Sequence, residues 1–145
     1  MLEVARTKKV PRLIQADGLS LPFQSEKFDA LTVAFGLRNM ASWETALREM
    51  SRVLRPAGFL LVMDFSLPRF APIRGLYRLY LHNVLPRIAA LLTGNKEAYE
   101  YLGSSIESFP RDEQMFALLK SCGYEEPRQY PLCFGIASIY TARRR

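Results

Sequence analysis

Residues 28–39 read FDALTVAFGLRN, and residues 55–66 read RPAGFLLVMDFS. Each stretch contains an apolar run of strand length, and the residues between the two runs predict a helix. Two buried strands joined by a helix form a β-α-β unit, in which the strands pair in parallel. Because ligands of parallel sheets collect just outside the carboxyl ends of the strands, we expect Gly36, Arg38 and Asn39 to lie where chemistry takes place.

The elements of this unit have distinct local signals. The strand over Phe28–Phe35 is apolar at nearly every position, which is typical of a parallel strand covered on both faces. Ser42 is the predicted N-cap of the helix. Pro56 and Gly58 end that helix and lead into the strand over Phe59–Phe65. The core-facing stripe of the helix is formed by Trp43, Leu47, Met50 and Leu54.

Further elements are expected on both sides of the unit, and we expect a single domain over residues 1–145. They are the tail of a helix over Met1–Lys9, a short strand over Arg12–Ala16, a helix opened by Pro72, a short helix over Glu97–Ile106, a helix over Arg111–Cys122 with Gly123 as its C-cap, and strands near Pro127–Tyr130 and Gly135–Thr141. Pro86 should kink or break the helix that Pro72 opens, because proline removes a backbone donor.

The composition narrows the class of protein. Hydrophobic residues make up 49% and charged residues 23% of the chain, which favours a globular domain over disorder. Cys122 and Cys133 fit no metal or CxxC spacing and favour a reduced, intracellular protein. No uncharged run reaches the ~20 residues that span a bilayer, and the amino terminus carries no signal-peptide core. The net charge of +6 is spread along the chain, which is typical of a solvated surface and only weakly favours nucleic acid as a partner.

Several motifs together resemble the menaquinone/ubiquinone C-methyltransferases over essentially the whole chain. Residues 15–23 read QADGLSLPF and are similar to the adenine-side loop of that family, and Ala34–Asn39 matches its most distinctive signature. Residues 99–102 read YEYL and resemble a late substrate-side segment. The family transfers a methyl group from S-adenosylmethionine to a ring carbon of a quinol precursor. The resemblance therefore implies S-adenosyl-L-methionine as cofactor and a prenylated quinol as substrate, with no metal and no nucleic acid.

The resemblance also implies the fold. It predicts an α/β, partial Rossmann-like class I methyltransferase fold with a mostly parallel sheet and helices on both faces. The first two strands of that family and its glycine-rich cofactor turn have no counterpart in residues 1–145. We therefore expect an open edge beside the strand over Phe28–Phe35. The chain would fold imperfectly there, or Arg12–Ala16 would move in to pair, or a partner chain or second copy would complete the sheet.

Site residues follow from the resemblance, residue by residue. Asp17 and Gly18 are expected to bind the adenine, and Ala34 to contact the cofactor through its backbone; for Asp17 a turn role is the alternative. Arg38 is the expected catalytic residue, because a guanidinium can stabilise a phenolate or hold the water that accepts its proton. Asn39 would orient that water or the quinol oxygen. For Arg38 the alternative is a surface ion pair or a charge next to a helix.

Other candidates come from the second half of the chain. Tyr99 and Tyr101 are expected to line the quinol pocket, with simple packing as the alternative. We interpret His82 as an exposed helix residue rather than a base, and Asp64 as a structural carboxylate at a strand end. The stretch Tyr77–Leu92 is apolar with interspersed arginines and could lie against a bilayer, although such a stripe is more often core.

The expected function is S-adenosylmethionine-dependent C-methylation of a prenylated quinol ring in menaquinone or ubiquinone biosynthesis. The resemblance leaves open whether this chain alone is an enzyme, because the glycine-rich motif is absent from its sequence. The alternative is a non-catalytic methyltransferase remnant that acts as a binding or assembly subunit. We expect a cytoplasmic protein, in peripheral contact with the inner membrane if its substrate is membrane-bound.

Overall fold

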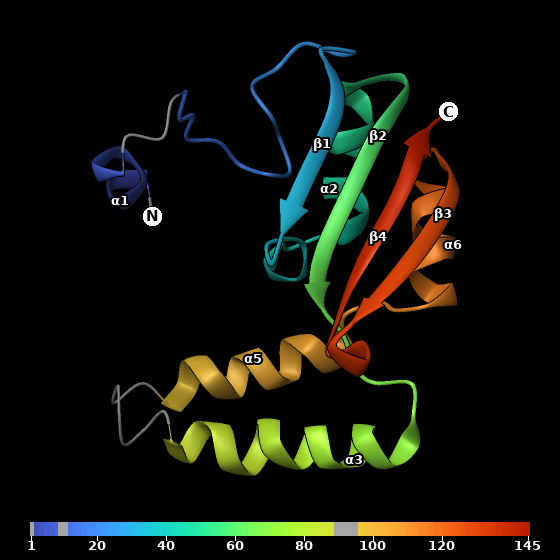
Figure 1. Cartoon of the computed structure of the whole chain (residues 1–145). Helices are drawn as coiled ribbons and strands as arrows, with labels where there is room; N and C mark the ends of the chain where they lie inside the picture. The colour runs from blue at the N-terminus through green and yellow to red at the C-terminus, as the bar shows by residue number, and fades with distance from the viewer. Residues whose placement is uncertain (1, 9–11, 89–95) are drawn as a thin grey trace.

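The computed structural model describes residues 2–8, 12–88 and 96–145 of the chain (Figure 1). A four-stranded sheet forms its centre, and a pair of helical segments lies beyond the carboxyl ends of two strands. In chain order the elements are α1 (Leu2–Thr7), β1 (Phe28–Ala34), the 3-10 turn η1 (Leu37–Asn39), α2 (Trp43–Val53), β2 (Leu54–Phe65), α3 (Ala71–Leu79), the π-helical turn η2 (Tyr80–Val84), α5 (Lys96–Ser108), α6 (Glu113–Ser121), β3 (Tyr124–Leu132), the 3-10 turn η3 (Cys133–Gly135) and β4 (Ala137–Arg144).

The predicted β-α-β unit is confirmed. β1 and β2 pair in parallel, and Ala34 at the end of β1 lies opposite Met63. At the start of α2 the Ser42 hydroxyl accepts a hydrogen bond from the backbone N–H of Thr45, as an N-cap does. Leu54, which closes the predicted helical stripe, is already the first residue of β2, so the helix ends one residue earlier than its hydrophobic pattern.

The sheet is mixed. Its strand order is β1-β2-β4-β3, and β4 runs antiparallel to both of its neighbours. The reason is local: η3 joins β3 to β4 in a short connection, and such a connection can join only antiparallel strands. The expected α/β, Rossmann-like architecture with a mostly parallel sheet is confirmed. Because β2 and β3 are both antiparallel to β4, the strands β1, β2 and β3 all run in one direction, and only β4 is reversed.

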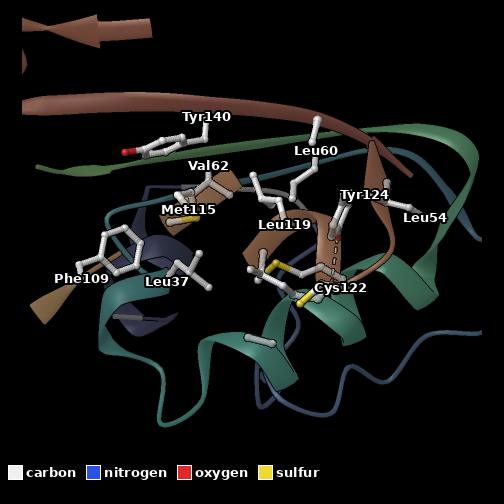
Figure 2. Close-up of a cluster of buried hydrophobic side chains, with 14 residues drawn as sticks. Leu37, Leu54, Leu60, Val62, Phe109, Met115, Leu119, Cys122, Tyr124 and Tyr140 are labelled. Atoms are coloured by element: carbon white, nitrogen blue, oxygen red, sulfur yellow. Dashed lines mark hydrogen bonds between the residues drawn. The ribbon is translucent and has the colours of Figure 1, made fainter. Parts of the chain in front are cut away.

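The main hydrophobic core lies between the sheet and the helices α2 and α6 (Figure 2). β2 contributes Leu60 and Val62, and α6 contributes Met115 and Leu119, all of them buried. The buried Tyr124 donates its hydroxyl to the backbone carbonyl oxygen of Leu47 on α2 at 3.1 Å, which satisfies the polar atom that its ring brings inside. Each fully buried Leu, Val or Met stabilises the fold by about 1.5–3 kcal/mol.

The opposite face of the sheet is more open. Both α2 and α6 belong to the same core cluster, so in the described part of the chain the expected cover on both faces is not found. β1 shows the consequence, because Ala30, Thr32 and Ala34 are exposed while Leu31 and Val33 are only half-buried. β1 is an edge strand. Its apolar sequence is therefore not explained by burial on both faces within the residues described.

The helical segments α3, η2 and α5 lie side by side beyond the strand ends (Figure 1). Leu67, Leu81 and Ile106 are buried between them and form a second, smaller core. The sequence predicts a kink or a break at Pro86. Helical structure continues through Pro86 to residue 88, so the helix does not break there, but the irregular π turn η2 precedes the proline. The wider geometry of this turn shifts the carbonyls that the ring would otherwise meet. Among the described helices, none has both the length and the apolar character to cross a bilayer.

The predicted strand over residues 12–16 is also wrong. This segment belongs to no strand, and the first pairing after it is an isolated bridge between Asp17 and Ser20. A strand needs a partner for its backbone groups and a face to bury. Ile14, the most apolar residue of the segment, is mostly exposed, so the segment gains no burial and does not close the open edge of β1.

Candidate functional site

The chain turns sharply where β1 ends. Phe35 has φ = +55°, a left-handed conformation that a bulky residue adopts only where its surroundings hold it. Its backbone N–H donates to the carbonyl oxygen of Met63 at 2.8 Å. Its carbonyl oxygen accepts from Nη1 of Arg38 at 3.0 Å and from Nδ2 of Asn39 at 3.3 Å. The two predicted catalytic residues therefore also hold the corner on which they sit.

Arg38 forms an ion pair with Asp64, the residue at the corresponding end of β2. Nη1 lies 2.8 Å from Oδ1, and the two side chains are 9% and 0% exposed. Oδ2 accepts from the backbone N–H of Arg38 at 3.2 Å, and Oδ1 from that of Phe65 at 2.9 Å. The carboxylate thus has three donors, which offset the desolvation of a fully buried charge. The alternative of a surface ion pair for Arg38 is wrong, because both side chains are buried or nearly so. Asp64 pairs near the end of its strand, which is the structural role expected of it.

Arg38 also has a buried donor that is not paired within the described part of the chain. Its Nε atom is buried and has no hydrogen-bond partner among the described residues. An unpaired buried donor costs about 1–3 kcal/mol, and native proteins keep few of them. The guanidinium carbon lies 5.3 Å from the centroid of the Phe65 ring, so one face of the cation is fixed against an aromatic ring. Arg38 is therefore a cation held in place at the carboxyl end of β1, with an Nε–H that no described residue uses.

Further aromatic side chains lie in the neighbourhood of Phe65 and Arg38. The rings of Phe35 and Phe65 lie 4.7 Å apart, and Tyr77 on α3 stacks with Tyr80 at 6.4 Å. Burial raises the pKa of Tyr77, with a smaller contribution from Tyr80, and the charge of Arg38 opposes that shift. The charge of Arg38 therefore favours the ionised form of the Tyr77 phenol. Sequence reasoning placed Tyr77 only on a packing face, because helical spacing does not reveal which strand end that face meets.

The predicted adenine-side residues lie in a tight turn near β1. Oδ1 of Asp17 accepts from the backbone N–H of Leu19 at 2.9 Å, which matches the turn role that aspartate commonly fills. The same carboxylate is exposed. A side chain at Gly18 would come within 2.8 Å of the end of the Met40 side chain, so the glycine lets the turn approach η1. Ala34 is exposed at the end of β1.

A groove of about 380 Å³ follows the open edge of β1. Its lining is mainly apolar and includes Gly18, Ala30, Thr32 and Met40. A flat heteroaromatic ring suits such a groove, with the exposed carboxylate of Asp17 next to it as an acceptor for an exocyclic amine. The residues present therefore fit the adenine end of the expected cofactor.

The structure does not bring the predicted substrate residues up to Arg38. Tyr99 is half-buried and Tyr101 mostly exposed, and both lie in the first half of α5. Within the described residues, no hydrogen bond or ring contact joins either tyrosine to Arg38. His82 is exposed, and its Nε2 lies 3.4 Å from a carboxylate oxygen of Glu107, which confirms the expectation of a surface position.

Comparison with curated proteins places these features in a family context. The chain is 42% identical to demethylmenaquinone methyltransferase of Thermus thermophilus, covering 99% of this chain and 67% of that protein. It is 37% identical to the ubiquinone/menaquinone biosynthesis C-methyltransferase UbiE of Haemophilus ducreyi, covering 97% of this chain and 57% of that protein. The chain thus spans between 57% and 67% of the length of these two relatives.

Solved structures agree on the fold. A SAM-dependent methyltransferase from Thermotoga maritima has a TM-score of 0.68 with this protein at 18% identity. The match covers 100% of this chain and 69% of that protein. Another from Aquifex aeolicus covers 99% of the chain, with a TM-score of 0.63 at 12% identity. At such identities the likeness concerns the fold alone.

The sequence itself decides the family, since residues 2–144 match the ubiE/COQ5 methyltransferase family almost from end to end. The chain therefore belongs to the ubiE/COQ5 methyltransferase family.

Proposed function

We propose that this protein takes part in the S-adenosylmethionine-dependent methylation of a quinol ring carbon in menaquinone or ubiquinone biosynthesis. The observation that carries the proposal is Arg38, a nearly buried cation at the carboxyl end of β1 that is anchored by Asp64 and keeps an unpaired Nε donor. The names of the relatives, a demethylmenaquinone methyltransferase and a quinone-biosynthesis C-methyltransferase, support the substrate class.

The chemistry assigns Arg38 a defined task. Methylation of a ring carbon needs electron density there, and a neighbouring phenol supplies more of it once its proton is lost. A guanidinium stays protonated and is a poor base. Arg38 therefore stabilises the phenolate through its guanidinium N–H groups or holds the water that takes the proton, and one such positioned donor is typically worth about 3–4 kcal/mol. Asn39, whose Nδ2 is committed to Phe35, offers its amide oxygen to that water or to the quinol hydroxyl.

S-Adenosylmethionine supplies an electrophilic methyl group when it is bound. We assign its adenine to Asp17 and Gly18, with the second carboxylate oxygen of Asp17 accepting from the exocyclic amine. The exposed Ala34, at the end of β1, would contact the cofactor through its backbone. The apolar groove beside Gly18 supports this assignment.

Substrate contacts are assigned to α5 and α3. Tyr99 and Tyr101 would line the route by which a prenylated quinol enters, since aromatic rings pair an apolar face with a polar tip. Tyr77, which lies within the electrostatic reach of Arg38, is added to them as a wall of the ring site.

The open edge of the sheet at β1 is a surface to which a partner chain could bind. β1 is the edge strand of the described sheet, and an open edge can accept a further strand from a partner chain or a second copy. We infer a cytoplasmic protein at the periphery of the inner membrane, because a prenylated substrate partitions into the bilayer. A non-catalytic binding or assembly role is the second candidate, which the same open edge supports and the names of the relatives disfavour.

Isothermal titration of S-adenosylhomocysteine into the purified chain tests the cofactor assignment. Micromolar binding that Asp17→Ala weakens at least tenfold, about 1.4 kcal/mol, is the expected result. Exposed Asp29 on the far end of β1 provides the matched control, Asp29→Ala, which should bind as the wild type does. The absence of binding in a folded sample would contradict the assignment of adenine to these residues.

A further inference from the structure

The helical segments α3 and η2 carry a second apolar stripe, which faces away from the small core that they share with α5. On α3 and η2 the residues Tyr77, Leu81 and Leu85 pack against α5 and its surroundings. Ile73, Leu76, Tyr80 and Val84 follow at spacings of three and four residues, which places them on one side of the helix. All four are exposed, Leu76 by 69%. A helix that packs on one partner needs only one apolar stripe, so packing in the core does not explain this second stripe.

A turn from another part of the chain extends this surface. Phe70, just before α3, is 65% exposed, and Phe134 on η3 is 88% exposed. Gly135 lies close to the backbone of Pro68, which precedes α3, and the next residue, Ile136, lines the same groove as Ile73. Ile136 and the stripe residues line a groove of about 450 Å³ that is almost wholly apolar. We call Phe70, Ile73, Leu76, Tyr80, Val84 and Phe134 the arm surface.

The backbone at η3 is strained in a way that exposes Phe134. Its φ is +57°, and that of the preceding Cys133 is +48°. Left-handed conformations at successive non-glycine residues cost of order 1–3 kcal/mol each. Burial does not offset this cost at Phe134, because its side chain is the most exposed of the large apolar residues described. An exposed aromatic on a strained turn points to contact with something outside the chain.

Positive charge borders the arm surface. Between Asp64 and Glu97 the sequence contains Arg69, Arg74, Arg78, Arg87 and Lys96 and no acidic residue. These five residues amount to most of the net charge of +6. Arg69, Arg74 and Arg111 also line one small pocket at the start of α3.

The acidic residues near this pocket and near α3 lie on other elements, and α5 carries Glu97 and Glu100 as well. Asp112 pairs with Arg69 at 2.8 Å, Glu107 pairs with Arg78 at 2.9 Å, and Glu113 lines the pocket. The helical segments that carry the arm surface, α3 and η2, therefore contain arginines and no acidic residue of their own. Apolar side chains flanked by arginines are typical of a helix that lies in the interface of an anionic bilayer.

We propose that the arm surface docks this protein on an anionic lipid bilayer, with its apolar side chains in the headgroup boundary and the neighbouring arginines against lipid phosphates. Charge favours this occupant over a second copy, because a two-fold contact would set the same arginines of two chains against each other. The inference goes beyond the proposed methyl transfer, and its test needs neither cofactor nor quinol.

Vesicle sedimentation tests the proposal on the purified chain. The wild type should bind vesicles of phosphatidylcholine with 30% phosphatidylglycerol, and bind pure phosphatidylcholine at least about tenfold more weakly. The variants Leu76→Asp and Phe134→Asp should each lose at least about tenfold on the anionic vesicles. Ile14→Asp introduces the same charge at an exposed apolar residue outside the arm surface and should bind as the wild type does. Circular dichroism melts confirm that each variant is folded.

An environment-sensitive fluorophore on Cys133 gives a second readout, because this thiol is exposed next to Phe134 while Cys122 is buried. A blue shift on anionic vesicles is expected. Equal binding of all variants, equal binding to neutral vesicles, or no spectral shift would overturn the proposal. Sedimentation velocity that shows a wild-type dimer broken by Leu76→Asp would overturn it in favour of a second copy.

Discussion

The guanidinium of Arg38 and the carboxylate of Asp64 meet at 2.8 Å although the two residues are 26 positions apart in the chain. They meet because β1 and β2 are adjacent and parallel, so that both strands end at the same edge of the sheet. Asp64 also accepts from the backbone N–H of Arg38. The carboxylate therefore fixes both the side chain and the turn that carries it, which makes the strand pairing itself a determinant of the site.

Asp64→Ala should be strongly destabilising. It leaves the Arg38 cation nearly buried without its counterion, and breaking a buried pair in this way typically costs about 3–5 kcal/mol. The free energy of unfolding in urea measures the loss.

The matched control for that variant is Glu44→Ala. Glu44 and Arg48 form an ion pair with the same 2.8 Å separation, but their side chains are 56% and 57% exposed, and such pairs contribute about 0–1 kcal/mol. Equal losses for Asp64→Ala and Glu44→Ala would mean that burial does not set the strength of the Arg38 pair.

Two glycine substitutions should change the stability of the fold in opposite directions. A methyl group on Gly58 would lie 2.7 Å from the carbonyl oxygen of Arg55 and 3.3 Å from that of Asp29. Both contacts are with backbone atoms that cannot rotate away, so Gly58→Ala should cost about 1–3 kcal/mol. On α3, Gly75 has no heavy atom within 4 Å of that position, and Gly75→Ala should stabilise the helix by about 0.5–1 kcal/mol. Melting temperatures that move in the same direction would contradict this account.

Alkaline pH should destabilise the fold through its buried tyrosines. Burial raises the pKa of Tyr124 above its ordinary value of 10.0, and raises that of Tyr140 in the same direction. The folded state therefore holds these protons more tightly than the unfolded state. Their contribution to stability is complete below pH 10 and is lost as the pH rises above it, by up to about 1.4 kcal/mol per pH unit for each tyrosine.

Tyr124→Phe isolates one of these groups. It removes the hydrogen bond to Leu47, which should cost about 0.5–1.5 kcal/mol at neutral pH. It should also make the stability curve above pH 10 less steep. Urea unfolding at a series of pH values measures both effects, and an unchanged slope would exclude Tyr124 as a contributor.

Local patterns predicted the fold where burial is periodic. The β-α-β unit and the late helix were readable because their apolar residues recur at strand or helix spacing and form one core. The segment over residues 12–16 has no such period, and its strand prediction failed because a strand depends on a partner that the sequence does not reveal. The antiparallel β4 was likewise not readable from hydrophobicity, because strand direction is set by the hairpin turn.

The site was predictable in part for a similar reason. Arg38 and Asn39 were found because the end of an apolar strand marks the place where ligands collect. The contacts of Arg38 with Asp64 and Phe65, and the effect of its charge on Tyr77, depend on how β2 and α3 are placed relative to η1. Those relationships are tertiary, and residue spacing along one element does not encode them.

Methyl transfer by a chimera tests the central claim most directly. The chain replaces the matching segment of the Thermus thermophilus relative, of which it covers 67%, and the product is assayed with labelled S-adenosylmethionine and a short-chain demethylmenaquinol. The decisive variant is Arg38→Lys, which keeps a cation for Asp64 and removes the Nε donor. The chimera should methylate the quinol, and Arg38→Lys should stay folded and lose at least about 100-fold in kcat. An inactive, folded chimera, or an Arg38→Lys variant with wild-type kcat, would contradict the account.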